Sequence, residues 1–209
     1  MVGMVTACTV AGLFDALARF HEAHPRVTIT LAEDDSASLT ARVRSGTADL
    51  ALIGAAGGPP HDLDALPVVS EGLAACFPSG HSLQNGGQRR LSLADLAGQP
   101  VVCMPAGTGI RAVLDQACAV QGLRLDIALE ASAPGTVADL AARGLGVAVL
   151  SESMAAGHAA RLRVLPLDGI DIPAVLALIW KPAPSPALAE LLRHCRDAFA
   201  APQPASARR

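Results

Sequence analysis

Tyrosine is absent from the 209-residue sequence, which contains only one tryptophan and four phenylalanines. Proteins stack unpaired bases on aromatic side chains, so this composition argues against a base-binding surface. Basic residues are not in excess either, because 16 Lys and Arg stand against 19 Asp and Glu, for a net charge of −3. We therefore predict that this chain does not itself contact DNA or RNA.

Long apolar segments are also lacking, since no run approaches the roughly 18–20 residues that span a bilayer. Val5–Cys8 is similar to a bacterial lipid-attachment box, but only four residues precede it and none is basic, so no signal peptide is expected. The five cysteines are widely spaced and form no CxxC pair, which predicts reduced thiols. These features predict a soluble cytoplasmic protein with no membrane partner.

What the sequence does contain is a repeated alternation of strands and helices, and 51 % of its residues are hydrophobic, as in folded proteins. The first βαβαβ unit has strands at 2–8, 27–31 and 48–53. Its second helix is capped by Ser36 or Ser38 and ended by Gly46. The second unit has strands at 101–104, 125–129 and 146–150, and its helices begin at Thr108 and Thr136.

The remaining segments complete an α/β fold. Strands are expected at 162–167 and 174–180, followed by a final helix that starts at Ser185-Pro186 and buries Leu188, Leu191, Leu192, Cys195 and Phe199. Two βαβαβ units imply two parallel sheets, because crossover helices connect parallel strands. Ligands of such sheets bind beyond the carboxyl ends of the strands, so we expect the functional residues there.

Several short motifs occur in a characteristic order: RFHEAHP at 19–25, SxxL at 36–39, GTADLAL at 46–52, PSGHSL at 78–83, LADL at 93–96, GTGIR at 107–111 and GLGVAVL at 144–150. In this order and spacing the chain resembles, over almost its whole length, the effector-binding (substrate-binding) domain of LysR-type transcriptional regulators.

The resemblance implies two βαβαβ subdomains joined by two crossing strands, as in type 2 periplasmic binding proteins. Subdomain I would comprise 1–73 and 177–209, and subdomain II would comprise 74–176. The crossings would lie near Gly72–Phe77 and Leu176–Trp180. The family's N-terminal winged helix-turn-helix is expected to be absent from this chain, so that DNA would be bound only through that missing domain.

The resemblance also implies an effector held in the cleft between the subdomains, by backbone N–H groups and hydroxyls that suit a small anionic metabolite. The matching positions are Thr6, Cys8, Thr9, Ser36, Gly54, Ala55, Met104, Gly107, Thr108, Ser132 and Ser151. Each of them could instead be a helix cap or a turn residue. Two positions depart from the family, because Ser151 replaces a common proline and Ala7 a common hydroxyl. Arg111 could neutralise a carboxylate or be a solvated surface residue.

Other chemistries find little support in the sequence. His21 and His24 lie at the His-Pro helix end found in the family, so no metal is expected, and Cys103 lies in an apolar strand, which favours a core thiol over an oxidant sensor. The GLG motif at 144–146 ends a helix and begins a strand, the reverse of a dinucleotide fingerprint. We expect no cofactor and no enzymatic activity.

The sequence therefore predicts the effector-sensing domain of a LysR-type regulator, acting as a homodimer or homotetramer. The resemblance implies that the helices at 13–20 and 108–121 meet across the dimer. A solute-binding protein of a transporter is the alternative, and an enzyme on the same scaffold is a third possibility.

Overall fold

The computed structural model describes residues 1–6, 10–84 and 87–200. Two compact units make up the chain, and each is described by itself below. The first comprises Met1–Ile53, Pro60–Val68 and Ala177–Arg209, and the second comprises Gly54–Pro59 and Val69–Leu176. Residues 54–59 and 69–73, predicted for subdomain I, belong to the second unit, and the crossing expected near Gly72–Phe77 lies earlier, at 68–69.

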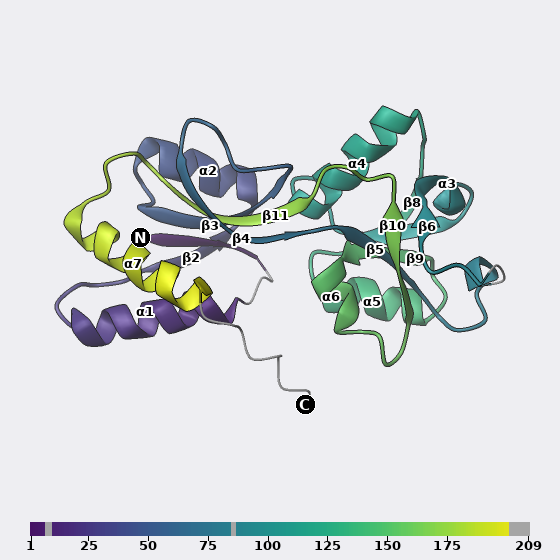
Figure 1. Cartoon of the computed structure of the whole chain (residues 1–209), viewed down its shortest axis with the longest axis horizontal. Helices are drawn as coiled ribbons and strands as arrows, with labels where there is room; N and C mark the ends of the chain where they lie inside the picture. The colour runs from purple at the N-terminus through teal and green to yellow at the C-terminus, as the bar shows by residue number, and fades with distance from the viewer. Residues whose placement is uncertain (7–9, 85–86, 201–209) are drawn as a thin grey trace. The chain divides into compact units, whose positions relative to one another are not determined.

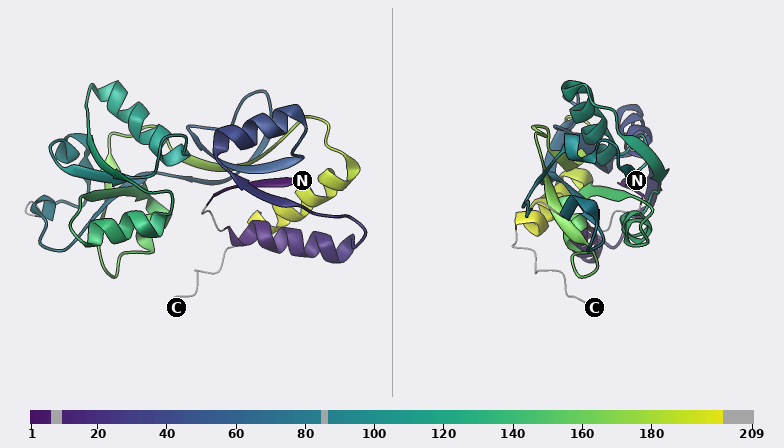
Figure 2. Two further views of the ribbon diagram at one scale, coloured as in Figure 1. Left: turned by 180° about the vertical axis from the view of Figure 1, so that it is seen from behind. Right: turned by 90° about the vertical axis from the view of Figure 1, so that its right-hand side faces the viewer.

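The first unit is built on a sheet with the strand order β2-β1-β3-β11-β4. These strands are β1 (Val2–Val5), β2 (Leu31–Asp34), β3 (Leu50–Ala56), β4 (Asp64–Glu71) and β11 (Ala174–Trp180). β1 pairs in parallel with both β2 and β3. The helices are α1 (Ala11–Ala23), α2 (Ser36–Ser45) and α7 (Pro186–Ala200). Figures 1 and 2 show α2 on one side of these strands and α1 with α7 on the other.

Helical periodicity explains how α7 packs. Its buried residues are Leu188, Leu191, Leu192, Cys195 and Ala198. Phe199 is only half-buried, contrary to our expectation. Its ring nevertheless packs closely on α1, because a Cβ added to Gly12 would lie only 2.8 Å from Cε1 of Phe199. The helix starts as predicted, because the Ser185 hydroxyl accepts a 3.3 Å hydrogen bond from the Leu188 N–H.

The second unit has a sheet in the order β6-β10-β5-β9-β7-β8. Its strands are β5 (Leu73–Phe77), β6 (Leu91–Ser92), β7 (Pro100–Cys103), β8 (Asp126–Glu130), β9 (Val147–Ser151) and β10 (Arg163–Asp168). The helices are η1 (Ser82–Gln84), α3 (Leu93–Leu96), α4 (Gly109–Gln121), α5 (Pro134–Ala142) and α6 (Glu152–Ala156). In Figure 1, α4 lies above these strands and α5 and α6 lie below them.

The expectation of a purely parallel sheet is wrong for this unit. β7, β8 and β9 are parallel to one another, whereas β5 runs antiparallel to both β9 and β10. β5 enters directly from β4, with only Gly72 between them. No crossover helix precedes β5, so the rule that makes βαβ strands parallel does not apply to it.

Local hydrogen bonding moves three further boundaries. β2 begins at Leu31, so the expected strand at 27–31 is wrong. Asp35, rather than Ser36 or Ser38, caps α2, and its carboxylate accepts the Ser38 N–H at 2.8 Å. α5 begins at Pro134 and not at Thr136, because proline at N1 is itself a favourable start.

Candidate functional site

Five of the predicted residues lie at the same edge of the second unit's sheet. Cys103 of β7 is in register with Glu130 of β8, and Val102 is in register with Ala148 of β9. Parallel strands in register end at one edge, so the residues that follow or end them are neighbours there. The structure thus gathers Met104, Gly107, Thr108, Ser132 and Ser151.

The N-terminus of α4 lies at this edge. The Thr108 hydroxyl donates to the Pro105 carbonyl at 2.9 Å and accepts the Arg111 N–H at 3.3 Å, so Thr108 is the predicted cap. Within the described residues, the amides of Gly109 and Ile110 have no hydrogen-bond acceptor. Because both residues are buried and the helix dipole is positive at this end, these two N–H groups suit an anion.

The end of β3 lies directly against α4. Gly54 and Ala55 lie inside β3, which extends to Ala56, and not after the strand as expected. A Cβ on Gly109 would be 2.6 Å from both the Ala55 nitrogen and the Gly54 carbonyl carbon. The predicted residues Gly54 and Ala55 therefore lie beside the N-terminus of α4, which the predicted Thr108 caps, although the two segments are far apart in sequence.

Ser151 ends β9, and only 3 % of its surface is exposed. Its hydroxyl has no hydrogen-bond partner among the described residues and does not cap α6. A buried polar group without a partner costs about 1–3 kcal/mol, which favours a site completed by a bound molecule.

The N-terminus of α6 differs from that of α4, because the chain's own carboxylate occupies it. Glu71 accepts the Ser153 N–H at 2.8 Å and the Ser153 hydroxyl at 2.7 Å. The Glu152 N–H donates to the Gly72 carbonyl at 3.1 Å. No sequence pattern predicts this role of Glu71, because its partner is 82 positions away.

The predicted residues of the first unit are only partly described. Thr6 follows β1, and its N–H donates to the Asp34 carbonyl at 3.2 Å. Ser36 is buried at the start of α2, where its carbonyl accepts the Thr40 hydroxyl at 2.7 Å. Cys8 and Thr9 lie outside the described residues.

Arg111 is held inside the second unit. Its guanidinium pairs with Asp115 at 2.8 Å and with Glu130 of β8, and its side chain is only 15 % exposed. Burial disfavours the charged form, but the hydrogen bonds to the two carboxylates outweigh this cost, so the pKa of Arg111 is raised. This arrangement supports a bridge between α4 and β8, and the expected alternative of a solvated side chain is wrong.

The cysteines outside residues 7–9 are free thiols in settings that oppose ionisation. Burial raises the pKa of Cys76 to about 12 and that of Cys195 to about 11. Burial also raises the pKa of Cys103, although the nearby Arg111 acts in the opposite direction. Thiolates are therefore disfavoured at these three positions.

Within the described ranges, no group of three His, Cys, Asp or Glu residues is placed to hold a metal ion. Among the helices of the described segments, none is both long and apolar enough to cross a bilayer.

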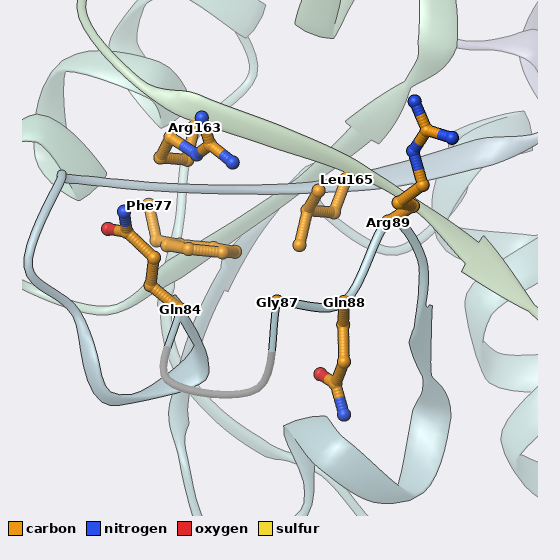
Figure 3. Close-up of a pocket in the computed structure, with 7 residues that line it drawn as sticks. All are labelled: Phe77, Gln84, Gly87, Gln88, Arg89, Arg163 and Leu165. Carbon is orange, nitrogen blue, oxygen red and sulfur yellow. The ribbon is translucent and has the colours of Figure 1, made fainter.

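A hollow of about 390 Å³ lies in the second unit between β5, β10 and the segment before β6. It is lined by Phe77, Gln84, Gly87, Gln88, Arg89, Arg163 and Leu165. Figure 3 shows Gln88 and Arg89 pointing in opposite directions, so the polar groups do not converge as they do in a specific binding site.

Comparison with known proteins gives a family match. The model of the LysR substrate binding domain matches residues 1–200. A probable hydrogen peroxide-inducible genes activator of Mycobacterium avium is 29 % identical over 164 residues, covering 78 % of this chain and 52 % of that protein. The HTH-type transcriptional regulator CysB of Burkholderia cenocepacia is 28 % identical over 137 residues, covering 66 % and 43 %. The chain thus spans about half the length of these relatives.

Solved structures share the fold. The effector-binding domain of QuiR in complex with shikimate has a TM-score of 0.76 at 16 % identity, with 96 % of each chain covered. The effector-binding domain of BenM with its effector benzoate gives 0.74 at 18 % identity, covering 95 % of this chain and 90 % of that one. Reduced OxyR gives 0.70 at 18 % identity, covering 95 % and 93 %. These likenesses confirm the predicted type 2 periplasmic-binding-like architecture.

Proposed function

Because the chain belongs to the LysR substrate binding domain family, we propose that it senses a small anionic metabolite and thereby controls a DNA-binding transcriptional regulator. One observation carries the anion assignment. At the N-terminus of α4, the amides of Gly109 and Ile110 are buried and lack an acceptor among the described residues. A carboxylate or phosphate can accept hydrogen bonds from both amides, and its negative charge interacts favourably with the positive end of the helix dipole.

Ser151 supplies a second polar group at the same sheet edge, since its buried hydroxyl lacks a partner in the described chain. A ligand with a carbonyl or hydroxyl beyond its acid group would satisfy it. Met104, which follows β7, is buried, and we propose it as the apolar neighbour of the ligand. We propose Gly54, Ala55, Gly107, Thr108 and Ser132 as further contacts, and Thr6, Cys8, Thr9 and Ser36 as contacts from the first unit.

The structural relatives agree with this chemistry. QuiR binds shikimate and BenM binds benzoate, and both ligands are carboxylates. For the present chain we define an anion panel of shikimate, benzoate, succinate and inorganic phosphate as probes. To control transcription, the effector must bind two arrangements of the regulator with different affinity, since a ligand with equal affinity shifts no equilibrium.

We propose that the chain acts in the cytoplasm as a homodimer or homotetramer, with DNA bound through a winged helix-turn-helix outside this sequence. Phe14 of α1 is 37 % exposed and Val120 of α4 is 79 % exposed. We propose that the faces of α1 and α4 that carry these side chains form the contacts between copies of the chain. A monomer by light scattering at high concentration would contradict this assignment.

Calorimetry with the anion panel tests the proposed function. We expect at least one member to bind, and a cationic analogue of similar size, such as benzylamine in place of benzoate, to bind far more weakly. A preference for neutral or cationic compounds in a wider metabolite screen would refute the anion assignment.

A further inference from the structure

The end of β3 and the turn after it form a separate feature, which we call the β3 strap and define as residues 54–59. β3 begins with Leu50–Ile53 in the first unit, but Gly54–Pro59 belong to the second unit. The strap is therefore the direct continuation of a first-unit strand, fixed on the second unit.

One end of the strap is held beside the start of β11. The Gly57 N–H donates to the Pro173 carbonyl at 2.9 Å. Gly57 has a φ of +77°, which glycine adopts without strain, and a Cβ there would be 3.2 Å from Cγ2 of Ile172. Ala56 packs against the second unit's core. The Gly57 amide thus reports whether the strap is docked.

The other end of the strap rests on the first residue of α4. A Cβ on Gly109 would lie 2.6 Å from the Ala55 nitrogen, 2.6 Å from the Gly54 carbonyl carbon and 3.0 Å from the Gly54 Cα. All three obstructing atoms are main chain, so no side chain can rotate out of the way. Only glycine at position 109 allows the strap and the helix to approach this closely.

From these contacts we infer that Gly109 is a positioning residue of the proposed anion site, which docks the β3 strap against the first turn of α4 and so couples a ligand at that turn to strand β3. The inference rests on the proposed function for its ligand. The docking itself concerns the ligand-free chain. An anion bound by the Gly109 and Ile110 amides would contact the first turn of α4, and the strap contacts the same turn at Gly109.

Gly109→Ala tests this inference, with Gly135→Ala as the matched control. Gly135 lies in the first turn of α5 in the same unit, and a Cβ there would meet nothing within 4 Å. Both substitutions gain similar helix propensity, so the difference between them isolates the contact with the strap.

The readout is hydrogen exchange of the Gly57 amide in the whole chain. In Gly109→Ala we expect exchange to accelerate about tenfold or more through local opening, and by more than at the β1 and β9 amides, whereas Gly135→Ala should stay within about twofold of the parent. Ile172→Ala loosens the strap from its other side and should accelerate Gly57 exchange while leaving the α4 amides protected. Unchanged Gly57 exchange in Gly109→Ala would overturn the docking.

Binding of the anion panel supplies the second readout. We expect Gly109→Ala to weaken the binding of a panel member about tenfold because the clash displaces the two amides, and also to lower the unfolding temperature because the strap no longer docks without strain. A purely structural role predicts a lower unfolding temperature with unchanged affinity, and this result would refute a positioning role. Absence of panel binding to the parent chain would count against the proposed function, and the exchange result would still decide the docking.

Discussion

The N-termini of α4 and α6 follow adjacent parallel strands, β7 and β9, yet they are completed differently. α4 is capped by the neutral hydroxyl of Thr108, and its first two amides have no acceptor in the described chain. α6 is closed by the Glu71 carboxylate, which binds the amide and hydroxyl of Ser153. The Glu71 carboxylate thus occupies the N-terminus of α6, whereas the N-terminus of α4 has no such internal anion and can bind a ligand.

The largest expected effect comes from making α4 resemble α6. Thr108→Asp places a carboxylate at the cap, where it can accept the Arg111 N–H and interact favourably with the helix dipole. The carboxylate cannot donate to the Pro105 carbonyl as the hydroxyl does, so we expect the two effects to offset one another within about 1 kcal/mol of stability, and anion affinity to fall about 100-fold through like-charge repulsion. Calorimetry and thermal unfolding measure both quantities.

Thr108→Asn is the neutral control for this change, because it keeps a capping oxygen without the charge. It should retain binding within a few-fold. Equal loss of affinity in both variants would show that shape, and not charge, is responsible.

Removing the carboxylate from α6 should produce the next largest effect. Glu71→Ala removes two hydrogen bonds to Ser153, and because this serine is exposed water can replace them, so we expect a loss of about 1 kcal/mol of unfolding free energy, as for other helix caps. Chemical denaturation measures the loss. Asp64→Ala, on the same strand, should change stability by less than about 0.5 kcal/mol. Similar losses in both variants would contradict the capping role of Glu71.

Ser151→Ala separates binding from stability. Because the hydroxyl lacks a partner among the described residues, its removal should leave the unfolding free energy unchanged or raise it by up to about 1 kcal/mol. Affinity for a bound panel member should fall about fivefold, which corresponds to one lost hydrogen bond. Ser79→Ala, at an exposed position of the same unit with no proposed ligand contact, is the control. A destabilised Ser151→Ala with normal affinity would show a structural hydroxyl.

The smallest effect concerns α2 of the first unit, whose cap is a charged side chain. Hydrogen bonds from the Ser38 backbone and hydroxyl lower the pKa of Asp35 below the ordinary value of an aspartate. The cap therefore contributes stability above about pH 4 and loses it as the pH falls through the lowered pKa. Asp35→Asn should flatten this acid limb slightly in pH-dependent denaturation, and an unchanged limb would argue against the cap.

Much of the fold followed from periodicity and capping. The Gly46 end of α2, with a φ of +79°, and the Thr108 start of α4 follow from local rules. The antiparallel β5 did not, because its pairing with β9 joins positions far apart in sequence. The end of β3 was also missed, because the apolar periodicity stops at Ile53 while the strand continues to Ala56.

The residues of the candidate site also fall into those that a sequence pattern indicates and those that depend on tertiary contacts. The ends of the predicted strands indicated Thr108 and Ser151 as site residues, because the carboxyl ends of parallel strands lie at one edge of a sheet. No pattern indicated that Glu71 would reach Ser153, or that Gly109 would touch Gly54, since both are tertiary contacts. Arg111 was open to two readings until its carboxylate partners were placed.

Amide NMR during titration with the anion panel tests the central claim most directly. If an anion binds at the N-terminus of α4, the Gly109 and Ile110 resonances should shift most, while the Ser153 amide, already bonded to Glu71, should not move. Binding that leaves Gly109 and Ile110 unperturbed, or that shifts Ser153 instead, would contradict the account.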